Sequence, residues 1–284
     1  MKKLNPLKAI VYLAAAFTLL IVVFIIAYIL YQGMPQIIIE VKSLFQGGDS
    51  IFQWKYNSDN VSLVPAIMNT LIMVGVSLAI SAVLGIGTAI YLVEYAKSGN
   101  KFVELIRITS ETLSGIPSII YGLFGMIFFV TYVGLGFSLL SGILTVSIMI
   151  LPLIIRSTEE ALKAVPVSYR EASFGLGAAK LRTIIVIILP SAMNGIMAGV
   201  ILAIGRVIGE TAALIYTSGI STSGGVAIDF TNVGGRTLAV HMYMLTSEGL
   251  HIDQAYATAA VLLIVVVGLN AISYALAKRL TKGK

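Results

Sequence analysis

Long apolar runs alternate with short polar stretches along nearly the whole chain. Six of these runs approach or exceed the roughly 20 residues that a helix needs to cross the hydrocarbon core of a bilayer. They lie at 9–30, 64–93, 108–130, 137–155, 183–213 and 256–277. The pattern predicts an all-α, polytopic membrane protein built as one six-helix transmembrane bundle.

The first run predicts a retained anchor rather than a cleaved signal peptide. Its 22 apolar residues exceed a normal signal-peptide core, and no small-residue cleavage site follows Leu30. We therefore divide the chain into an N-terminal anchor with an external segment at 1–63, a transmembrane core at 64–277 that contains a cytoplasmic loop at 156–182, and a basic cytoplasmic tail at 278–284.

The composition agrees with a membrane protein and narrows its chemistry. Hydrophobic residues make up 58% of the chain and charged residues 11%. The absence of cysteine excludes disulfides and thiolate metal sites, and His241 and His251 are too few for a convincing metal site. No HExxH, Gly-x-Ser-x-Gly or Walker A motif occurs, so we predict no catalytic residue, no cofactor and no metal in this chain.

Lysine and arginine are distributed unevenly between the two sides of the predicted bundle. Fifteen fall in segments that face one side, including both termini and the stretch 156–182, whereas only Lys42, Lys55 and Arg236 face the other. The positive-inside rule then places both termini and this stretch in the cytoplasm. The net charge of +6 follows from this bias and needs no nucleic-acid partner.

An ordered motif begins within the stretch 156–182 and ends at Pro190. From Glu171 it reads Glu-Ala-Ser, three residues, Gly177, nine residues, Ile187, one residue, Leu189-Pro190. A loop that only obeyed the positive-inside rule would explain its cations but not this spacing. The motif resembles the docking loop of ATP-binding-cassette (ABC) import permeases, which take their energy from a separate ATPase. The resemblance implies coupling roles for Glu171, Ala172, Ser173, Gly177, Leu189 and Pro190.

The local sequence predicts how this docking loop folds. Residues 157–164 are helix formers, Pro166 interrupts them, and 169–179 predict a second short helix with a turn at Gly177. Glu171 would then mark the groove of the ATPase.

Arg206 lies about midway along the fifth apolar run, where a charge costs roughly 2.5 to 3.5 kcal/mol on insertion scales. Glu210 follows four residues later and would share a face of a continuous helix, so a local ion pair is one interpretation. The other is a charge on a substrate pathway, which we favour because intramembrane charges usually face a bundle interior or a water-filled cavity.

Arg156, at the end of the fourth run, also has two interpretations, and both stay open. Its side chain could extend to the headgroups, or its guanidinium could bind a tetrahedral oxyanion together with Arg206. If the cargo is an anion, Glu210 favours protonated phosphate, whose O–H groups can donate hydrogen bonds to a carboxylate, over sulfate or molybdate, which carry no proton near neutral pH.

Glycine and proline mark further features. Gly115 and Pro117 break the third run, and the amides near Ser118 could face an anion, or the break could be a packing kink. Two small-xxx-small spacings predict close helix packing: Gly195 with Gly199, and Gly205 with Gly209. We interpret the glycine- and serine-rich part of the external segment 217–254 as a linker rather than a mobile gate.

Four segments narrow the resemblance to the phosphate-specific permeases of ABC importers, closer to the PstA type than to the PstC type. They lie at 89–96, 114–125, 151–162 and 205–213. Val83 and Asn194 depart from the family, which usually has proline at both positions. The resemblance implies a type I importer permease fold and a pathway role for Arg156, Arg206, Glu210, Thr211 and Ser118.

The resemblance also implies the partners. A PstA-type subunit pairs with a PstC-type permease, two copies of a PstB-type ATPase that bind ATP and Mg²⁺, and an external PstS-type binding protein. The chain would then be a non-enzymatic, multi-pass subunit of the cytoplasmic (inner) membrane, in contact with lipid, that moves inorganic phosphate. The alternatives are an importer of sulfate, molybdate or an organic solute, and a membrane-embedded enzyme.

Overall fold

The computed structural model describes residues 6–46, 50–54, 62–97, 99–221, 234–249 and 251–282. Within these ranges the α-helices are α1 (Pro6–Phe45), α2 (Val64–Ile90), α3 (Lys101–Ser114), α4 (Ser118–Gly125), α5 (Leu139–Lys163), α6 (Val167–Gly175), α7 (Lys180–Thr183), α8 (Leu189–Ile208), α9 (Ala212–Thr217), α10 (Leu238–Glu248) and α11 (Ile252–Lys282). Three π-helical segments join them: η1 (Tyr91–Tyr95), η2 (Met126–Tyr132) and η3 (Ile184–Ile188). Part of the predicted linker, from residue 222 on, and the last two residues of the tail lie outside the described residues.

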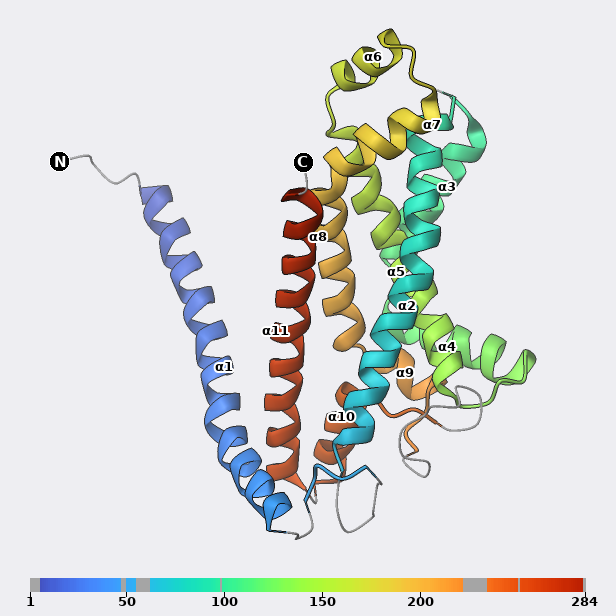
Figure 1. Ribbon diagram of the computed structural model, residues 1–284. Helices are drawn as coiled ribbons and strands as arrows, with labels where there is room; N and C mark the ends of the chain where they lie inside the picture. Colours follow the sequence, from blue (N-terminus) through green and yellow to red (C-terminus); the bar gives the residue numbers. More distant parts are fainter. Residues whose placement is uncertain are drawn as a thin grey trace, which may run out of the picture.

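Among the described residues, five helical stretches are long and apolar enough to cross a membrane. They are Leu7–Phe45, Val64–Tyr95, Leu139–Lys163, Lys180–Ile208 and Ile252–Arg279. A sixth span results if Lys101–Ser114 and Ser118–Tyr132 are counted together, with a bend of 104° between them. The predicted all-α, polytopic architecture is confirmed. Helix α1 begins and α11 ends toward the end of the bundle from which α6 projects (Figure 1).

The break in the third apolar run is confirmed at the predicted residues. Helix α3 ends at Ser114, and Pro117, with φ −58° and ψ 142°, starts α4 in a new direction because proline has no N–H to continue a helical ladder. The Tyr121 hydroxyl donates to the carbonyl of Leu113 at 2.8 Å. The same carbonyl accepts the backbone N–H of Ile116 at 3.2 Å, so the Tyr121 hydroxyl is an additional donor that joins α4 to the end of α3.

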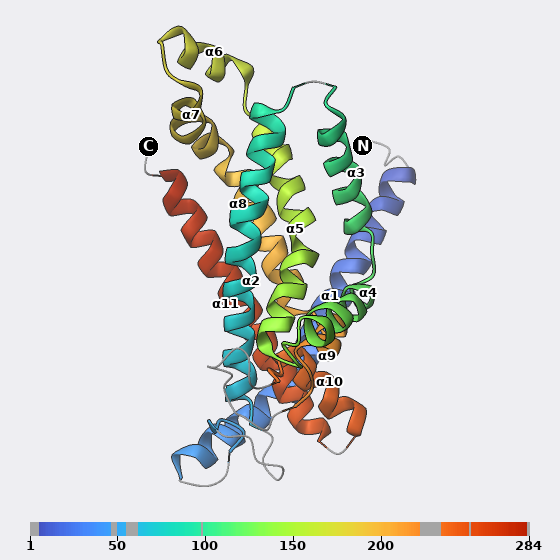
Figure 2. The ribbon, with the colours of Figure 1, turned by 90° about the vertical axis from the view of Figure 1, so that its right-hand side faces the viewer.

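Helix α5 is the centre of the bundle, with α2 and α8 packed against it (Figures 1 and 2). The Ser81 hydroxyl of α2 donates to the carbonyl of Ser147 in α5 at 2.9 Å. A Cβ atom added at Gly199 of α8 would collide with Ser157 of α5. Hydroxyl bonds and glycine contacts of this kind join helices where lipid provides no hydrophobic driving force between them.

The two small-xxx-small pairs have different surroundings. A Cβ added at Gly195 would lie 2.6 Å from the Ala161 Cβ, so the packing role predicted for the pair with Gly199 is confirmed. A Cβ added at Gly205 would meet nothing within 4 Å. For the pair of Gly205 with Gly209, the predicted helix packing is therefore wrong within the described chain.

Helix α1 stands apart from the bundle over most of its length and meets α11 only toward its C-terminal part (Figure 1). A Cβ at Gly33 would collide there with the carbonyl oxygen of Tyr256. The ring of Tyr28 meets the ring of Tyr256 edge to face, with centroids 6.0 Å apart. The apolar side chains of the rest of α1 are exposed, as expected of a helix surrounded by lipid.

We predict that Gly199→Val destabilises the bundle, whereas Gly75→Ala does not. The added side chain must push α8 away from Ser157, and overpacking of this kind costs about 1–3 kcal/mol. The Cβ of Gly75→Ala enters open space on α2. The measurement is the midpoint of thermal unfolding of the detergent-solubilised subunit, and equal midpoints for the two variants would contradict the α5–α8 contact.

Candidate functional site

The predicted docking loop forms the short helix α6, which projects from one end of the bundle (Figures 1 and 2). Pro166 precedes α6, and Gly177 follows it at φ +80°, in the left-handed region that favours glycine. Glu171 and Ala172 are exposed. Ser173 is buried, and its hydroxyl lies 2.8 Å from the hydroxyl of Thr183. The first two residues of the motif therefore face outward, and the third fixes the loop from inside.

Apolar side chains surround the exposed face of α6. Leu176 is 89% exposed, and with Tyr169, Val186 and Ile187 it lines an open hollow of about 380 Å³. Exposed apolar surface of this kind, rimmed by polar residues, is typical of a protein-binding site.

Leu189 and Pro190 lie on the return of the loop. Leu189 packs against a buried cluster that includes Leu162 and Ile188, and Pro190 stands in the first turn of α8. These two residues are half-buried and support the loop.

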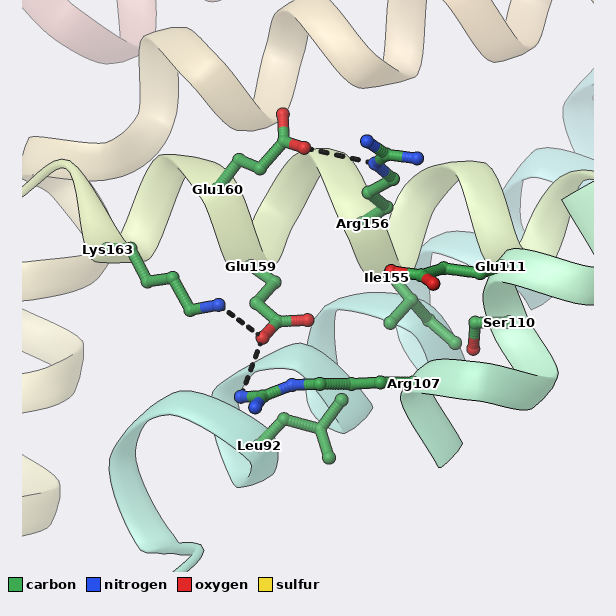
Figure 3. A pocket seen from close by; sticks show the side chains of 9 residues that line it. All are labelled: Leu92, Arg107, Ser110, Glu111, Ile155, Arg156, Glu159, Glu160 and Lys163. Carbon is green, nitrogen blue, oxygen red and sulfur yellow. Dashed lines mark hydrogen bonds and ion pairs between the residues drawn. The ribbon is translucent and has the colours of Figure 1, made fainter. Parts of the chain in front are cut away.

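Arg156 lies on α5 and lines a cavity of about 150 Å³ between α3 and α5 (Figure 3). Its Nε lies 3.0 Å from Glu160 Oε1, and both side chains are mostly exposed. On the other side of the same cavity, one oxygen of Glu159 pairs with Arg107 Nη2 at 2.8 Å and with Lys163 Nζ at 2.7 Å. Glu111 also lines the cavity, which thus holds three cations and three carboxylates.

Arg206 and Glu210 are not partners. Helix α8 ends at Ile208, so Glu210 no longer follows the helical spacing on which the predicted ion pair depended. Glu210 is buried, and its Oε1 accepts the backbone N–H of Ala213 at 3.0 Å, at the start of α9. Arg206 is half-buried and has no ion-pair partner among the described residues. The interpretation of a local ion pair is therefore wrong.

Ser118 and Thr211 lie near the two helix breaks. Ser118 begins α4 and Thr211 precedes α9, and these short helices pack together so closely that a Cβ at Gly122 would lie 2.8 Å from the Ala213 Cα. The structure thus brings the breaks after α3 and after α8 to one place.

The register of α5 and α8 separates the two arginines along the bundle. These antiparallel helices place 195 opposite 161 and 199 opposite 157. Continued along both helices, this register puts Arg156 opposite position 200, six residues before Arg206. At 1.5 Å per residue the offset is about 9 Å, so the backbones of Arg156 and Arg206 lie at different depths of the bundle.

Sequence reasoning missed one contact of the docking loop. In the sequence, Arg170 counted only as one of the basic residues of the stretch 156–182. In the structure, its Nη2 lies 2.7 Å from Glu94 Oε1 in η1. The only sequence signal was a carboxylate at the end of the second apolar run.

The histidines offer no metal site in the part of the chain that the structure describes, where no group of three or more His, Asp or Glu side chains could hold an ion. Burial, together with the positive charge of Arg236, lowers the pKa of His241 from 6.5 to about 3. His241 is therefore uncharged at neutral pH.

The helical bundle with its projecting loop defines a membrane permease of the ABC-importer type. Residues 81–284 match the family described as binding-protein-dependent transport system inner membrane component, and the chain belongs to this family. It is a multi-pass permease subunit of the inner membrane that belongs to a binding-protein-dependent transport system.

Named relatives and solved structures agree with this assignment. The chain is 32% identical over 278 residues to the "Probable ABC transporter permease protein YqgI" of Bacillus subtilis, covering 91% of this chain and 89% of the relative. It is 34% identical over 205 residues to "Phosphate transport system permease protein PstA 1" of Mycobacterium tuberculosis, covering 72% and 67%. The MetNI methionine transporter (TM-score 0.63, 21% identity, 77% and 96% coverage) and a bacterial alginate transporter (0.61, 17%, 95% and 96%) share the fold.

We predict that Glu159→Gln destabilises the subunit and that Glu160→Gln does so much less. Glu159 is largely buried and forms ion pairs with two cations, so its neutralisation removes both ion pairs and leaves Arg107 and Lys163 without their carboxylate. The Arg156–Glu160 pair is exposed and contributes about 0–1 kcal/mol. The measurement is the midpoint of thermal unfolding of each variant in detergent. A lower midpoint for Glu160→Gln than for Glu159→Gln would refute this account of the cavity.

Proposed function

We propose that this chain is a PstA-type permease subunit of an ATP-driven importer of inorganic phosphate. It would act with a PstC-type permease, two copies of a PstB-type ATPase and an external PstS-type binding protein. The observation that carries the proposal is Arg206, a half-buried cation in an apolar helix with no ion-pair partner among the described residues. Such a charge needs compensation, and an anionic cargo supplies it. The relatives named PstA support phosphate as that anion.

The bundle supports a pathway with two successive anion positions. Arg206 lies near the helix breaks, where Ser118 begins α4 and Thr211 precedes α9, and Arg156 lies about 9 Å closer to the docking end. Guanidinium groups suit phosphate because their paired donors match two of its oxygens. Glu210 uses one oxygen to accept a hydrogen bond from the Ala213 N–H, and its second oxygen can accept a hydrogen bond from the O–H that phosphate carries and sulfate lacks.

The orientation supports ATP-driven import. Helix α1 begins and α11 ends toward the end of the bundle from which α6 projects, and the sequence segments assigned to that side contain fifteen of the lysines and arginines. We therefore assign this end to the cytoplasm, where an ATPase can bind Glu171 and the apolar surface around Leu176.

The second candidate is an importer of another oxyanion or an organic solute on the same fold. Uptake of labelled phosphate into vesicles by the assembled complex tests the choice, with sulfate, molybdate and unlabelled phosphate as competitors. Competition by phosphate alone is expected, and uptake that sulfate or molybdate suppresses equally would exclude phosphate specificity.

We predict that Glu171→Lys and Gly177→Val each uncouple ATP hydrolysis from uptake while the subunit still inserts. The first reverses the charge offered to the ATPase, and the second forces a β-branched residue into a left-handed conformation that costs about 1–2 kcal/mol. ATP hydrolysis and phosphate uptake are measured on the same vesicles. Normal uptake by both variants would show that α6 is not the docking element.

We predict that Arg206→Lys loses phosphate uptake nearly as completely as Arg206→Gln, because an ammonium keeps the charge but not the planar pair of donors. Arg279→Gln, an exposed change in α11, is the control and should transport normally. The double change Arg206→Gln with Glu210→Gln should not restore uptake, since the two side chains are not partners. A working lysine variant would contradict the role of Arg206 on the pathway.

A further inference from the structure

Arg170, next to Glu171, connects α6 with two other elements of the bundle. Its Nε and Nη2 donate to Glu94 Oε1 at 3.0 and 2.7 Å. Its Nη1 and Nη2 also donate to the carbonyls of Val165 at 2.9 Å and Leu162 at 3.0 Å. Only 17% of the Arg170 side chain and 7% of the Glu94 side chain are exposed. One side chain thus joins the docking helix to the end of α5 and to η1.

The surroundings of Arg170 distinguish it from an ordinary surface cation. Helix α5 ends at Lys163, so the carbonyls near this end lack helical partners and carry the negative end of the helix dipole. A guanidinium can serve these carbonyls and a carboxylate at once because its donors point in several directions, which an ammonium on a flexible stem does not reproduce. By contrast, the exposed Arg156–Glu160 pair joins two residues of one helix.

A second contact joins the same elements. Lys180 of α7 holds its Nζ 4.9 Å from the centroid of the Tyr95 ring in η1, within the range of a cation–π interaction. Helix α7 is in turn bound to α6 through Ser173 and Thr183. The docking loop therefore contacts two consecutive residues of η1, Glu94 and Tyr95.

We propose that Arg170 is a positioning residue of the transport cycle: through Glu94 it makes α6 and η1 move as one unit, so that movement of the docking helix passes to α2. The inference rests on the proposed docking role of α6. Helix α2 is 27 residues long, about 40 Å, and leads directly into η1. It is bound to α5 through Ser81. A displacement at η1 therefore reaches the opposite end of the bundle, where α4 and α9 meet.

Distances between spin labels test the unit directly and need no assumption about the cargo. The chain has no cysteine, so Ser168→Cys on α6 and Tyr91→Cys on η1, both exposed, carry the only two labels of this subunit. We expect one narrow distance distribution that is the same without nucleotide and after trapping with ATP and vanadate. Addition of Arg170→Gln should broaden it. A distance that shifts on trapping, or that ignores Arg170→Gln, overturns the proposal.

Transport stoichiometry tests the consequence. Arg170→Gln and Glu94→Gln should each lower the amount of phosphate moved per ATP hydrolysed by about tenfold, which is the usual size of a coupling between two sites. The ATPase should still copurify with both variants. Because both changes cut one link, the double variant should be no worse than either single variant. Glu104→Gln and Arg279→Gln, exposed carboxylate and arginine controls, should keep the ratio of the unsubstituted chain.

The outcomes separate this inference from the proposed function. Losses that add in the double variant, or that appear only as a lower thermal midpoint with an unchanged ratio, would show that the pair merely stabilises the fold. If the unsubstituted complex moves no phosphate, the proposed cargo is wrong, and the label distances alone then decide whether α6 and η1 form one unit.

Discussion

Close contact of α5 with α2 and α8 is the interaction on which the rest of the structure depends. Lipid gives apolar helices no reason to associate, so the contact relies on small residues and on hydroxyl bonds, as at Gly199 with Ser157 and at Ser81 with Ser147. This contact fixes the register of α5 against α8. The register then sets the depth of Arg156 and of Arg206 in the bundle. It also sets the depth at which α5 ends and the docking loop begins.

Where the helices break, the same scarcity of water decides how polar groups are arranged. The Tyr121 hydroxyl donates to the Leu113 carbonyl beside the break after α3, and the Glu210 carboxylate accepts an N–H after the break that follows α8. Both breaks meet in one place because α4 and α9 pack on each other. Glu210 accepts a backbone hydrogen bond there and does not pair with Arg206, so the guanidinium of Arg206 is not neutralised by this carboxylate.

Much of the fold could be predicted from sequence because its signals are local. Apolar length predicted the spans, and Pro117 predicted the break after α3. Pro166 and Gly177 predicted a short helix in the docking loop, but the helix is Val167–Gly175 rather than 169–179 because Gly177 adopts a left-handed turn after its end. The Arg206–Glu210 prediction failed because it continued α8 past its end at Ile208. The Arg170–Glu94 pair joins positions 76 apart in sequence, and only the packing of η1 beside α6 brings them together.

The charges of the bundle are arranged differently at its two levels. Near the helix breaks Arg206 has no carboxylate paired with it among the described residues, whereas toward the docking end the cavity beside Arg156 holds equal numbers of cations and carboxylates. In the proposed importer, an anion that moves from Arg206 toward the docking end would pass from a cation without an ion-pair partner to a network of balanced ion pairs. Transport requires that binding weaken before release, and a balanced network of ion pairs provides weak binding without leaving a bare charge in the apolar bundle.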